Sequence, residues 1–221
     1  MAALYINSYA PLACSALGRE AARVHGLPPF VDGSIRREPD LEHEFPAISC
    51  LCRADKFAPR LRVSDVVMYL TKKERYGARQ PHRRLTAVLE VLAVLASHAD
   101  AAAWYKKRGM PLPNNCMVAG NRPHPLDESH RRFRAGGCAG DARTHRSWEA
   151  GYRARARRYP TFVVCRPLFR ELSWNAPVVE DAHMIKALGH LPGTQNPGAL
   201  PLEALTGLMR AVGIDVRPSA P

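Results

Sequence analysis

The sequence predicts an α+β fold, because segments typical of strands and segments typical of helices follow one another along the chain. Short runs rich in β-branched and aromatic residues recur between residues 4 and 165. A capping motif at Ser97 marks the start of a helix, and residues 144–159 carry apolar side chains at helical spacing. Apolar residues make up 46% of the 221 residues, which is enough for a buried core and excludes a largely disordered chain.

The N-terminal part of the chain is predicted to form a strand, a helix and a loop. Residues 4–9 predict a strand that stops before Pro11. Residues 15–25 predict a short helix, and Gly26 supplies the usual stop signal after its last turn. Residues 27–44 are rich in proline, glycine and charge, and this composition predicts a loop.

Two further strands are predicted between residues 45 and 70. Residues 45–53 predict a strand, in which alternation places three side chains on one face: Ile48, Cys50 and Cys52. A basic connection follows, and the Val-Ser-Asp core of residues 61–70 then predicts a tight turn that leads into a strand. A second basic loop is expected at residues 72–84.

Residues 85–96 have an ambiguous pattern. Their leucines and alanines favour a helix, whereas their valines are compatible with a buried strand, and periodicity alone does not decide between the two. Ser97 and Asp100 then form a helix cap, in which the serine oxygen accepts from exposed backbone amides. Because a new helix starts at Ser97, we interpret residues 85–96 as a strand.

The C-terminal half begins with a long segment of little periodicity, residues 110–140. Residues 144–159 predict a helix with an inward stripe formed by Trp148, Tyr152, Ala156 and Tyr159. Arginines follow helical spacing on roughly the opposite side of this helix. Residues 161–165 predict a last strand, and residues 180–190 and 201–212 predict short helices.

The charge of the chain points to a polyanionic partner. Thirty-two lysines and arginines against 20 acidic residues give a net charge of +12. Residues 131–170 alone hold eleven arginines and two acidic residues, a local charge of +9. A basic surface without a ligand, or the arginine usage of a GC-rich genome, is the alternative explanation.

A membrane-spanning or exported protein is not expected. The longest nearly apolar stretch, residues 85–96, falls well short of the roughly 20 residues that cross a bilayer. The N-terminus shows no basic segment followed by an apolar one, so no secretory signal is visible. The six cysteines are scattered, as in a protein that keeps them reduced, and we expect a cytoplasmic location.

The order of these segments resembles the PUA-like β-barrel superfamily, which includes the ASCH, EVE and YTH domains and the nucleotide-modification-associated domains. Residues 4–9 are similar to the first strand of YTH and EVE domains, and residues 45–53 with the Val-Ser-Asp turn are similar to the nucleotide-modification-associated group. The resemblance covers residues 4–120. Ser64 stands where that group usually has glycine, and Asn7 stands where YTH and EVE domains often have lysine.

The resemblance implies a partly closed β-barrel that binds nucleic acid, often with a pocket for a flipped or modified base. We therefore expect residues 1–170 to form a PUA-like domain that includes the basic helix, and residues 171–221 to form a small helical extension packed on it. The expected function is non-catalytic binding of DNA or RNA, including recognition of a modified nucleotide. No cofactor, catalytic residue or metal ligand is assigned.

The residues expected to bind nucleic acid fall into two sets. Cations for phosphates are expected in two connections and on the basic helix: Arg53, Lys56, Arg60, Lys72, Lys73, Arg75, Arg143, Arg146, Arg153 and Arg157. The base pocket is expected at the end of the first strand and after the capped helix, from Asn7, Ser8, Tyr9, Asn114 and Asn115. The two later asparagines are equally typical of an ordinary turn.

Two other classes of function remain open. A metal-dependent nuclease or nucleotide-modifying enzyme could use histidine, cysteine and aspartate side chains, chiefly Cys116, His124, His130, Cys138 and His145. Their spacing fits zinc poorly. A second acidic group, Asp181 with Glu180 and His183, is more typical of a helix N-terminus. A protein-interaction role for the proline-rich C-terminal region has little support in the sequence.

Overall fold

The computed structural model describes residues 2–130 and 138–214, the side chains of residues 138–141 excepted. Its centre is a curled, mixed sheet with the strand order β2-β5-β4-β3-β1-β7, and β6 pairs with one end of β4. The strands are β1 (Ala3–Tyr9), β2 (Ala47–Ser49), β3 (Val66–Thr71), β4 (Arg83–Leu95), β5 (Phe162–Arg170), β6 (Val178–Val179) and β7 (Leu200–Pro201).

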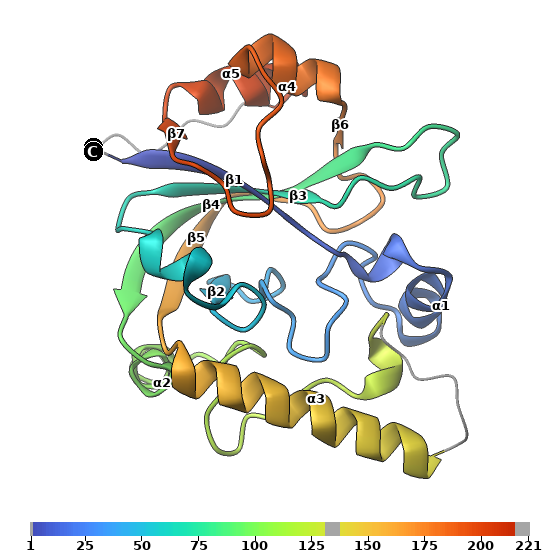
Figure 1. The fold of residues 1–221 in the computed structure, drawn as a ribbon, viewed down its shortest axis with the longest axis vertical. Coiled ribbons are helices and arrows are strands. Elements are labelled where there is room, and N and C mark those ends of the chain that lie inside the picture. The colour runs from blue at the N-terminus through green and yellow to red at the C-terminus, as the bar shows by residue number, and fades with distance from the viewer. Residues whose placement is uncertain (1, 131–137, 215–221) are drawn as a thin grey trace.

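Helices cover both faces of the sheet (Figure 1). The α-helices are α1 (Ala16–His25), α2 (His98–Lys106), α3 (Cys138–Arg158), α4 (Asp181–Leu188) and α5 (Ala204–Ala211). Short 3-10 helices are η1 (Leu12–Cys14), η2 (Ala54–Lys56), η3 (Ala58–Arg60) and η4 (Leu126–Glu128). In Figure 1, α4 and α5 lie above the sheet, whereas α2 and α3 lie below it. The predicted α+β class is confirmed.

The pairing of the strands explains the mixed character of the sheet. β1 runs parallel to β3, from Leu4 opposite Val66 to Tyr9 opposite Thr71. The other pairings are antiparallel, and the longest joins β4 to β5 with two irregularities in its register. Such irregularities bend a strand and increase its twist. The sheet therefore curls, and β2 reaches the concave side through its pairing with β5.

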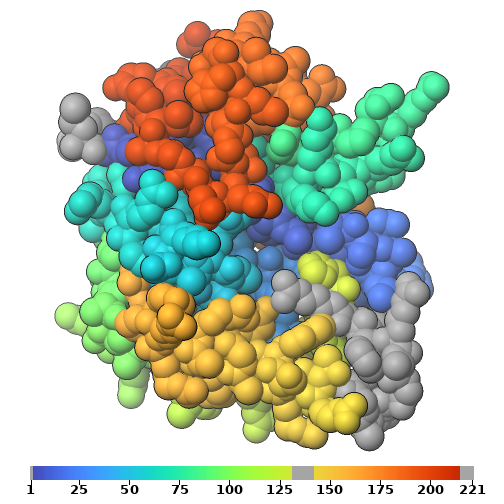
Figure 2. Space-filling view, in the orientation of Figure 1, coloured from blue at the N-terminus to red at the C-terminus, as the bar shows by residue number. Residues whose placement is uncertain are grey.

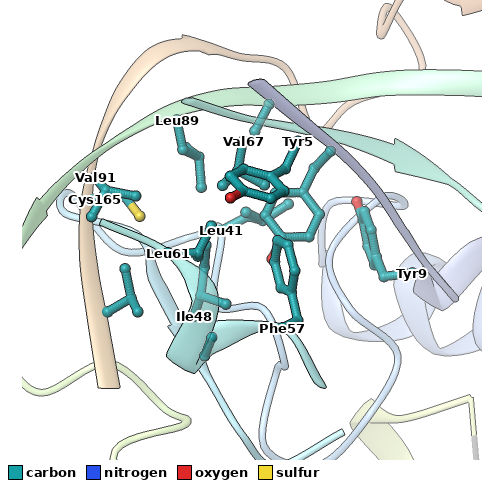
Figure 3. Packing of buried hydrophobic residues seen from close by; sticks show 14 of the residues in the cluster. Tyr5, Tyr9, Leu41, Ile48, Phe57, Leu61, Val67, Leu89, Val91 and Cys165 are labelled. Carbon is teal, nitrogen blue, oxygen red and sulfur yellow. The ribbon is translucent and has the colours of Figure 1, made fainter. Parts of the chain in front are cut away.

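The concave face of the sheet holds a large apolar cluster (Figure 3). Tyr5 and Tyr9 of β1 point into it because alternate residues of a strand share a face. Val67, Leu89 and Cys165 enter it from the neighbouring strands. The remaining side comes from β2 and from the segments before and after it, including Leu41, Ile48, Phe57 and Leu61. In Figure 3, Tyr9 lies at one end of this cluster, beyond Phe57.

The convex face of the sheet is covered by the C-terminal segment. Leu4 and Ile6 of β1 pack with Leu205, Leu208 and Met209 of α5 and with neighbouring apolar side chains. The helices predicted at residues 180–190 and 201–212 are confirmed as α4 and α5. The same segment also adds β6 and β7 to the sheet, which the sequence did not indicate because each strand has only two residues.

The ends of several elements follow the expected local rules. Residues 85–96 are confirmed as a strand, since β4 runs through Leu95. The Ser97 hydroxyl accepts from the backbone N–H of Asp100 at 3.1 Å and so caps α2. Gly26 ends α1 with a φ of 64°, in the left-handed region that glycine adopts without strain.

The strand predicted at residues 45–53 is wrong beyond Ser49. The chain pairs with β5 only over Ala47–Ser49 and then turns into η2. As a result Ile48 and Cys50 are buried in the concave cluster, whereas Cys52 is exposed instead of sharing their face. The predicted alternation of buried and exposed side chains places Ile48 and Cys50 correctly. It does not extend to Cys52, because the chain has left the strand there.

Residues 27–44 form a loop as predicted, but this loop lies inside the protein. Residues 29–41 are buried along their whole length, and Arg36 and Arg37 are 0% and 1% exposed. Arg36 donates to Glu149 of α3 and to the carbonyls of Asn114 and Asn121. Because the buried guanidinium groups are satisfied by such partners, the polar loop can serve as part of the core.

The basic helix is longer than predicted, and it packs through the expected stripe. α3 covers Cys138–Arg158, where the sequence predicted residues 144–159. Tyr152 and Ala156 are buried against Ile35 and Leu51, and Trp148 packs beside them. No helix in residues 2–130 or 138–214 is long and apolar enough to cross a membrane.

Candidate functional site

A cavity of about 300 Å³ opens where β1 ends on the concave side of the sheet. Its walls come from the end of β1, the buried loop, β2 with the turn that follows, and Gln195 of the C-terminal segment. Figure 2 shows a hollow at the centre of one face, between the cyan segment around η2 and η3, the dark blue end of β1 and the red C-terminal loop. Its volume lies at the small end of the range for ligand pockets, about 300–1,000 Å³.

The polar floor of the cavity is built around Glu38 from the buried loop. Its Oε1 accepts from the backbone N–H of Ser49 at 2.8 Å, and its Oε2 accepts from the Ser49 hydroxyl and from Asn115 Nδ2 at 2.9 Å. The residue is only 6% exposed. Burial raises the pKa of Glu38 to about 7, although the hydrogen bonds from Ser49 and Asn115 oppose this shift.

Asn7 is the second polar group of the floor. It points to the concave face with Tyr5 and Tyr9, and it is 2% exposed. Its Oδ1 has no hydrogen-bond partner among the described residues. Burial raises the pKa of Tyr69 well above its ordinary value, and a side-chain hydrogen bond from Asn7 opposes this rise. The Asn7 amide is thus held on one side by Tyr69 and keeps an unused acceptor.

The apolar walls of the cavity are continuous with the concave cluster. Ile48, Phe57, Tyr69 and Tyr9 line it. Tyr69 stacks edge to face with Tyr9 at 6.0 Å between ring centroids, and the Tyr9 hydroxyl donates to the carbonyl of Phe30. These contacts fix the rings, so the cavity has rigid apolar sides and a polar floor, the composition typical of a small-molecule pocket.

Two cations lie at the cavity. Arg53, from the turn after β2, donates to the backbone carbonyl of Ser8 and lines the cavity. Lys72, which follows β3, also lines it and pairs with Glu74 at 3.0 Å. The Lys72 side chain is 63% exposed, so water screens this pair strongly. Both cations can therefore reach an anion at the mouth of the cavity.

The opposite wall depends on a close approach between Gly33 and His130. A Cβ atom on Gly33 would lie 1.8 Å from the His130 ring, so only glycine fits at this position. The His130 backbone N–H donates to the Gly33 carbonyl at 3.0 Å. Asp32 completes this wall, and its Oδ1 accepts from the backbone N–H of Glu38 at 3.1 Å.

The five residues predicted for a base pocket occupy three kinds of position. Asn7, Ser8 and Tyr9 line the cavity, although the Ser8 hydroxyl lies 2.9 Å from Thr194 Oγ1. Asn115 is 0% exposed and sits behind Glu38, which it holds in place. Asn114 is absent from the cavity lining, and its Nδ2 donates to the carbonyl of Arg122.

The predicted cations lie in several groups around the hollow. Arg53 and Lys72 line the cavity, and Lys56 and Arg60 are exposed on η2 and η3, beside Phe57 of the cavity wall. A second hollow is lined by Lys73 and Arg75 together with Arg19 of α1 and the half-buried Cys14. Exposed arginines lie along α3, which passes below the first hollow in Figure 2: Arg143, Arg146, Arg153 and Arg157.

Besides Lys72, which pairs with Glu74, two of these predicted cations have acidic partners. Arg153 pairs with Glu149 at 2.9 Å, and Lys73 pairs with Asp181 at 2.8 Å. Asp181 also binds Arg83, and the hydrogen bond from Lys73 lowers the pKa of its carboxyl. Asp181 is the first residue of α4, as expected of an acid at a helix N-terminus.

The side chains considered for a metal are dispersed where the structure describes them. Cys116 is buried and its thiol points to the carbonyl of His98, whereas His124 lies 2.9 Å from Glu128 Oε2. His145 lies 2.9 Å from the carbonyl of His124. The Cys138 side chain and residues 131–137 lie outside the part of the chain that the structure describes. Within the described part, no three histidine, cysteine, aspartate or glutamate side chains lie close enough together to hold a metal ion.

Sequence reasoning missed Glu38, Ser49, Phe57 and Gln195 as residues of the cavity. Glu38 lies in a loop whose composition signals solvent exposure, and nothing local indicates that the loop is buried. Residues 36–40 are two arginines, a glutamate and an aspartate around a proline, a composition typical of a solvated turn. The sequence therefore does not indicate that Glu38 lines a cavity.

We compared the chain with family models, with curated proteins and with solved structures, and none of the three comparisons gave a match.

Proposed function

We propose that this protein binds nucleic acid without catalysing a reaction, and that it holds one base, unmodified or modified, in the cavity at the end of β1. The observation that carries the proposal is the composition of this cavity. It combines apolar walls, a polar floor at Glu38 and Asn7, and two cations, Arg53 and Lys72. A nucleotide in a strand matches all three features, because the ring of its base has apolar faces, the edge of the base is polar and the phosphate is anionic.

The cations around the hollow support binding of the phosphate backbone. Arginine is more frequent than lysine among them, and its planar group suits bidentate phosphate contacts. The arginines of α3 lie on the exposed side of a helix that packs through Tyr152 and Ala156. A strand could thus contact α3, the η2–η3 segment and Lys72 while one base enters the cavity.

The resemblance to the PUA-like superfamily supports the same proposal. That superfamily would place a base pocket at the end of its first strand, where this chain has a cavity lined by Asn7, Ser8 and Tyr9. A curled mixed sheet is also the core that such a barrel requires. We propose the superfamily assignment on these grounds, together with a cytoplasmic location and DNA or RNA as the partner.

Binding of labelled oligonucleotides at 50 mM salt tests the proposal. The wild-type protein should bind, and a variant with Arg143→Glu, Arg146→Glu and Arg157→Glu should bind at least about tenfold more weakly. Arg210→Glu is the control for each of these substitutions made singly, because Arg210 is exposed on α5 across the sheet from the cavity. Absence of binding by the wild type, or equal loss in the control, would contradict the proposal.

A nucleotide-modifying enzyme is the second candidate, and the environment of Glu38 favours it. A buried carboxyl with a pKa of about 7 is suited to general acid–base catalysis near neutral pH. Mass spectrometry of nucleosides and oligonucleotides incubated with the protein tests this candidate. A change in mass that disappears in Glu38→Gln would support the enzyme, and unchanged masses would leave binding as the function.

A further inference from the structure

We propose that the base held in the cavity carries an exocyclic amino group, as adenine, cytosine and guanine do, and that Asn7 and Glu38 accept its N–H groups. This inference rests on the proposed function and specifies its ligand. Thymine and uracil, whose corresponding positions carry carbonyl oxygens, would be disfavoured.

The first support is the unused acceptor on Asn7. A buried carbonyl oxygen without a donor destabilises the free protein, since it has lost water and gained no partner. The Asn7 amide is only 2% exposed, and its Oδ1 is unpartnered within the described ranges. A ligand N–H entering the cavity would supply the missing donor.

The second support is the arrangement of hydrogen bonds on Glu38. Ser49 and Asn115 occupy Oε2, whereas Oε1 accepts only the backbone N–H of Ser49 in the described structure. Each oxygen of an ionised carboxylate can accept two hydrogen bonds, so Oε1 retains a free acceptor position when Glu38 is ionised. This position belongs to a side chain that lines the cavity and is otherwise enclosed by protein.

At the floor of the cavity, the donors beside Glu38 are already engaged, so acceptors are in excess there. The Ser49 hydroxyl donates to Glu38, and Arg53 donates to the Ser8 carbonyl at the wall. Asp32 adds a further carboxylate, whose Oδ1 accepts from Ser34 and from the Glu38 backbone. A base edge that presents N–H groups complements this floor, whereas carbonyl oxygens of thymine or uracil would face acceptors.

Oligonucleotides that differ at one base test the inference. The background is a short thymine strand in which one internal base is varied, with cytosine compared with uracil and guanine with hypoxanthine. Each pair differs at one exocyclic amino group, which uracil replaces by a carbonyl oxygen, with a proton added on N3, and which hypoxanthine replaces by hydrogen. The strand with the amino group should bind about tenfold more tightly within each pair. Equal affinities within both pairs would overturn the inference, while salt-dependent binding of all strands would leave the proposed function intact. Failure of every strand to bind would refute the proposed function itself.

Variants of the floor identify the residues responsible. Asn7→Leu should reduce the preference within each pair to about twofold or less, yet retain the salt-dependent binding of the thymine strand. Glu38→Gln should reduce the preference as well, and its melting temperature shows whether it folds. Asn114→Leu is the matched control, because Asn114 also has an unpartnered Oδ1 but lies outside the cavity lining. A preference that persists in Asn7→Leu, or is lost equally in Asn114→Leu, would contradict the assignment.

Discussion

Ser49 binds both carboxyl oxygens of Glu38, through its backbone N–H at 2.8 Å and through its hydroxyl. Ser49 ends β2, and Glu38 lies in the buried loop, so this pair fastens the loop to the sheet beside the cavity. Burial raises the pKa of Glu38 to about 7, and the nearby Asp32 adds to the rise. The loop therefore brings an ionisable group into the core, and the stability of the protein should depend on its protonation.

We predict that replacing Glu38 alters the pH dependence of stability. The raised pKa means that folding favours the protonated carboxyl, so its stabilising contribution is complete below about pH 4.5 and is lost as the pH rises through 7. Between pH 5 and 8 the wild-type protein should thereby lose up to about 2–3 kcal/mol of unfolding free energy. In the Glu38→Gln variant, the unfolding free energy should fall much less between these two pH values, as measured by urea unfolding at each. An identical decline in both proteins would show that Glu38 is ionised without penalty.

Asn7→Leu should increase stability while it impairs recognition of the base. The substitution removes a buried acceptor that lacks a donor, and we expect this gain to exceed the loss of the side-chain hydrogen bond to Tyr69. We expect a rise of about 1 kcal/mol in the unfolding free energy. Denaturant titration measures it, and a fall of more than about 1 kcal/mol would indicate that Asn7 serves the fold instead of a ligand.

Ser64→Gly should also stabilise the protein. Ser64 has a φ of 72° in the turn before β3, a left-handed conformation that strains residues with a side chain. After allowance for the greater freedom of glycine in the unfolded chain, the gain should be about 0.5–1 kcal/mol. Ser147→Gly in the exposed face of α3 is the control, where the same change should cost about 0.5 kcal/mol. Thermal unfolding should show a higher melting temperature for Ser64→Gly and a lower one for Ser147→Gly, and a lower melting temperature for Ser64→Gly would contradict the prediction.

Glu149→Ala should destabilise the protein strongly. Glu149 binds the guanidinium of Arg36, whose side chain is 0% exposed, so its removal leaves a buried charge without its counter-ion. Loss of one partner of such a pair costs about 3–5 kcal/mol. Glu44→Ala, which truncates an exposed glutamate, should change stability by less than about 0.5 kcal/mol. Urea unfolding compares the two, and similar small effects would show that Arg36 needs no acidic partner.

Local signals in the sequence were sufficient for much of the fold. The serine cap at Ser97 and the glycine at Gly26 set element ends through contacts within one turn, and both appear as predicted. The buried stripe of Tyr152 and Ala156 was predictable because apolar residues at helical spacing share the face that packs against the core. Features with no local cause escaped prediction. The two residues of β7 form a strand only because β1 lies beside them.

The candidate site was only half predictable for the same reason. The resemblance of the first strand to that of YTH and EVE domains indicated Asn7, Ser8 and Tyr9, and they line the cavity. Glu38 was not indicated, since its burial depends on Ser49 and Asn115, which are 11 and 77 residues away in sequence. A charged loop looks solvent-exposed until such distant partners are known.

The salt dependence of oligonucleotide binding tests the central proposal most directly. If six to ten of the predicted cations bind phosphates of double-stranded DNA, the logarithm of the association constant should fall against the logarithm of salt concentration with a slope of about −5 to −9. Affinity should then drop roughly 10³- to 10⁵-fold between 50 and 200 mM salt. A slope near zero, or no binding at 50 mM salt, would contradict the view that these cations bind nucleic acid.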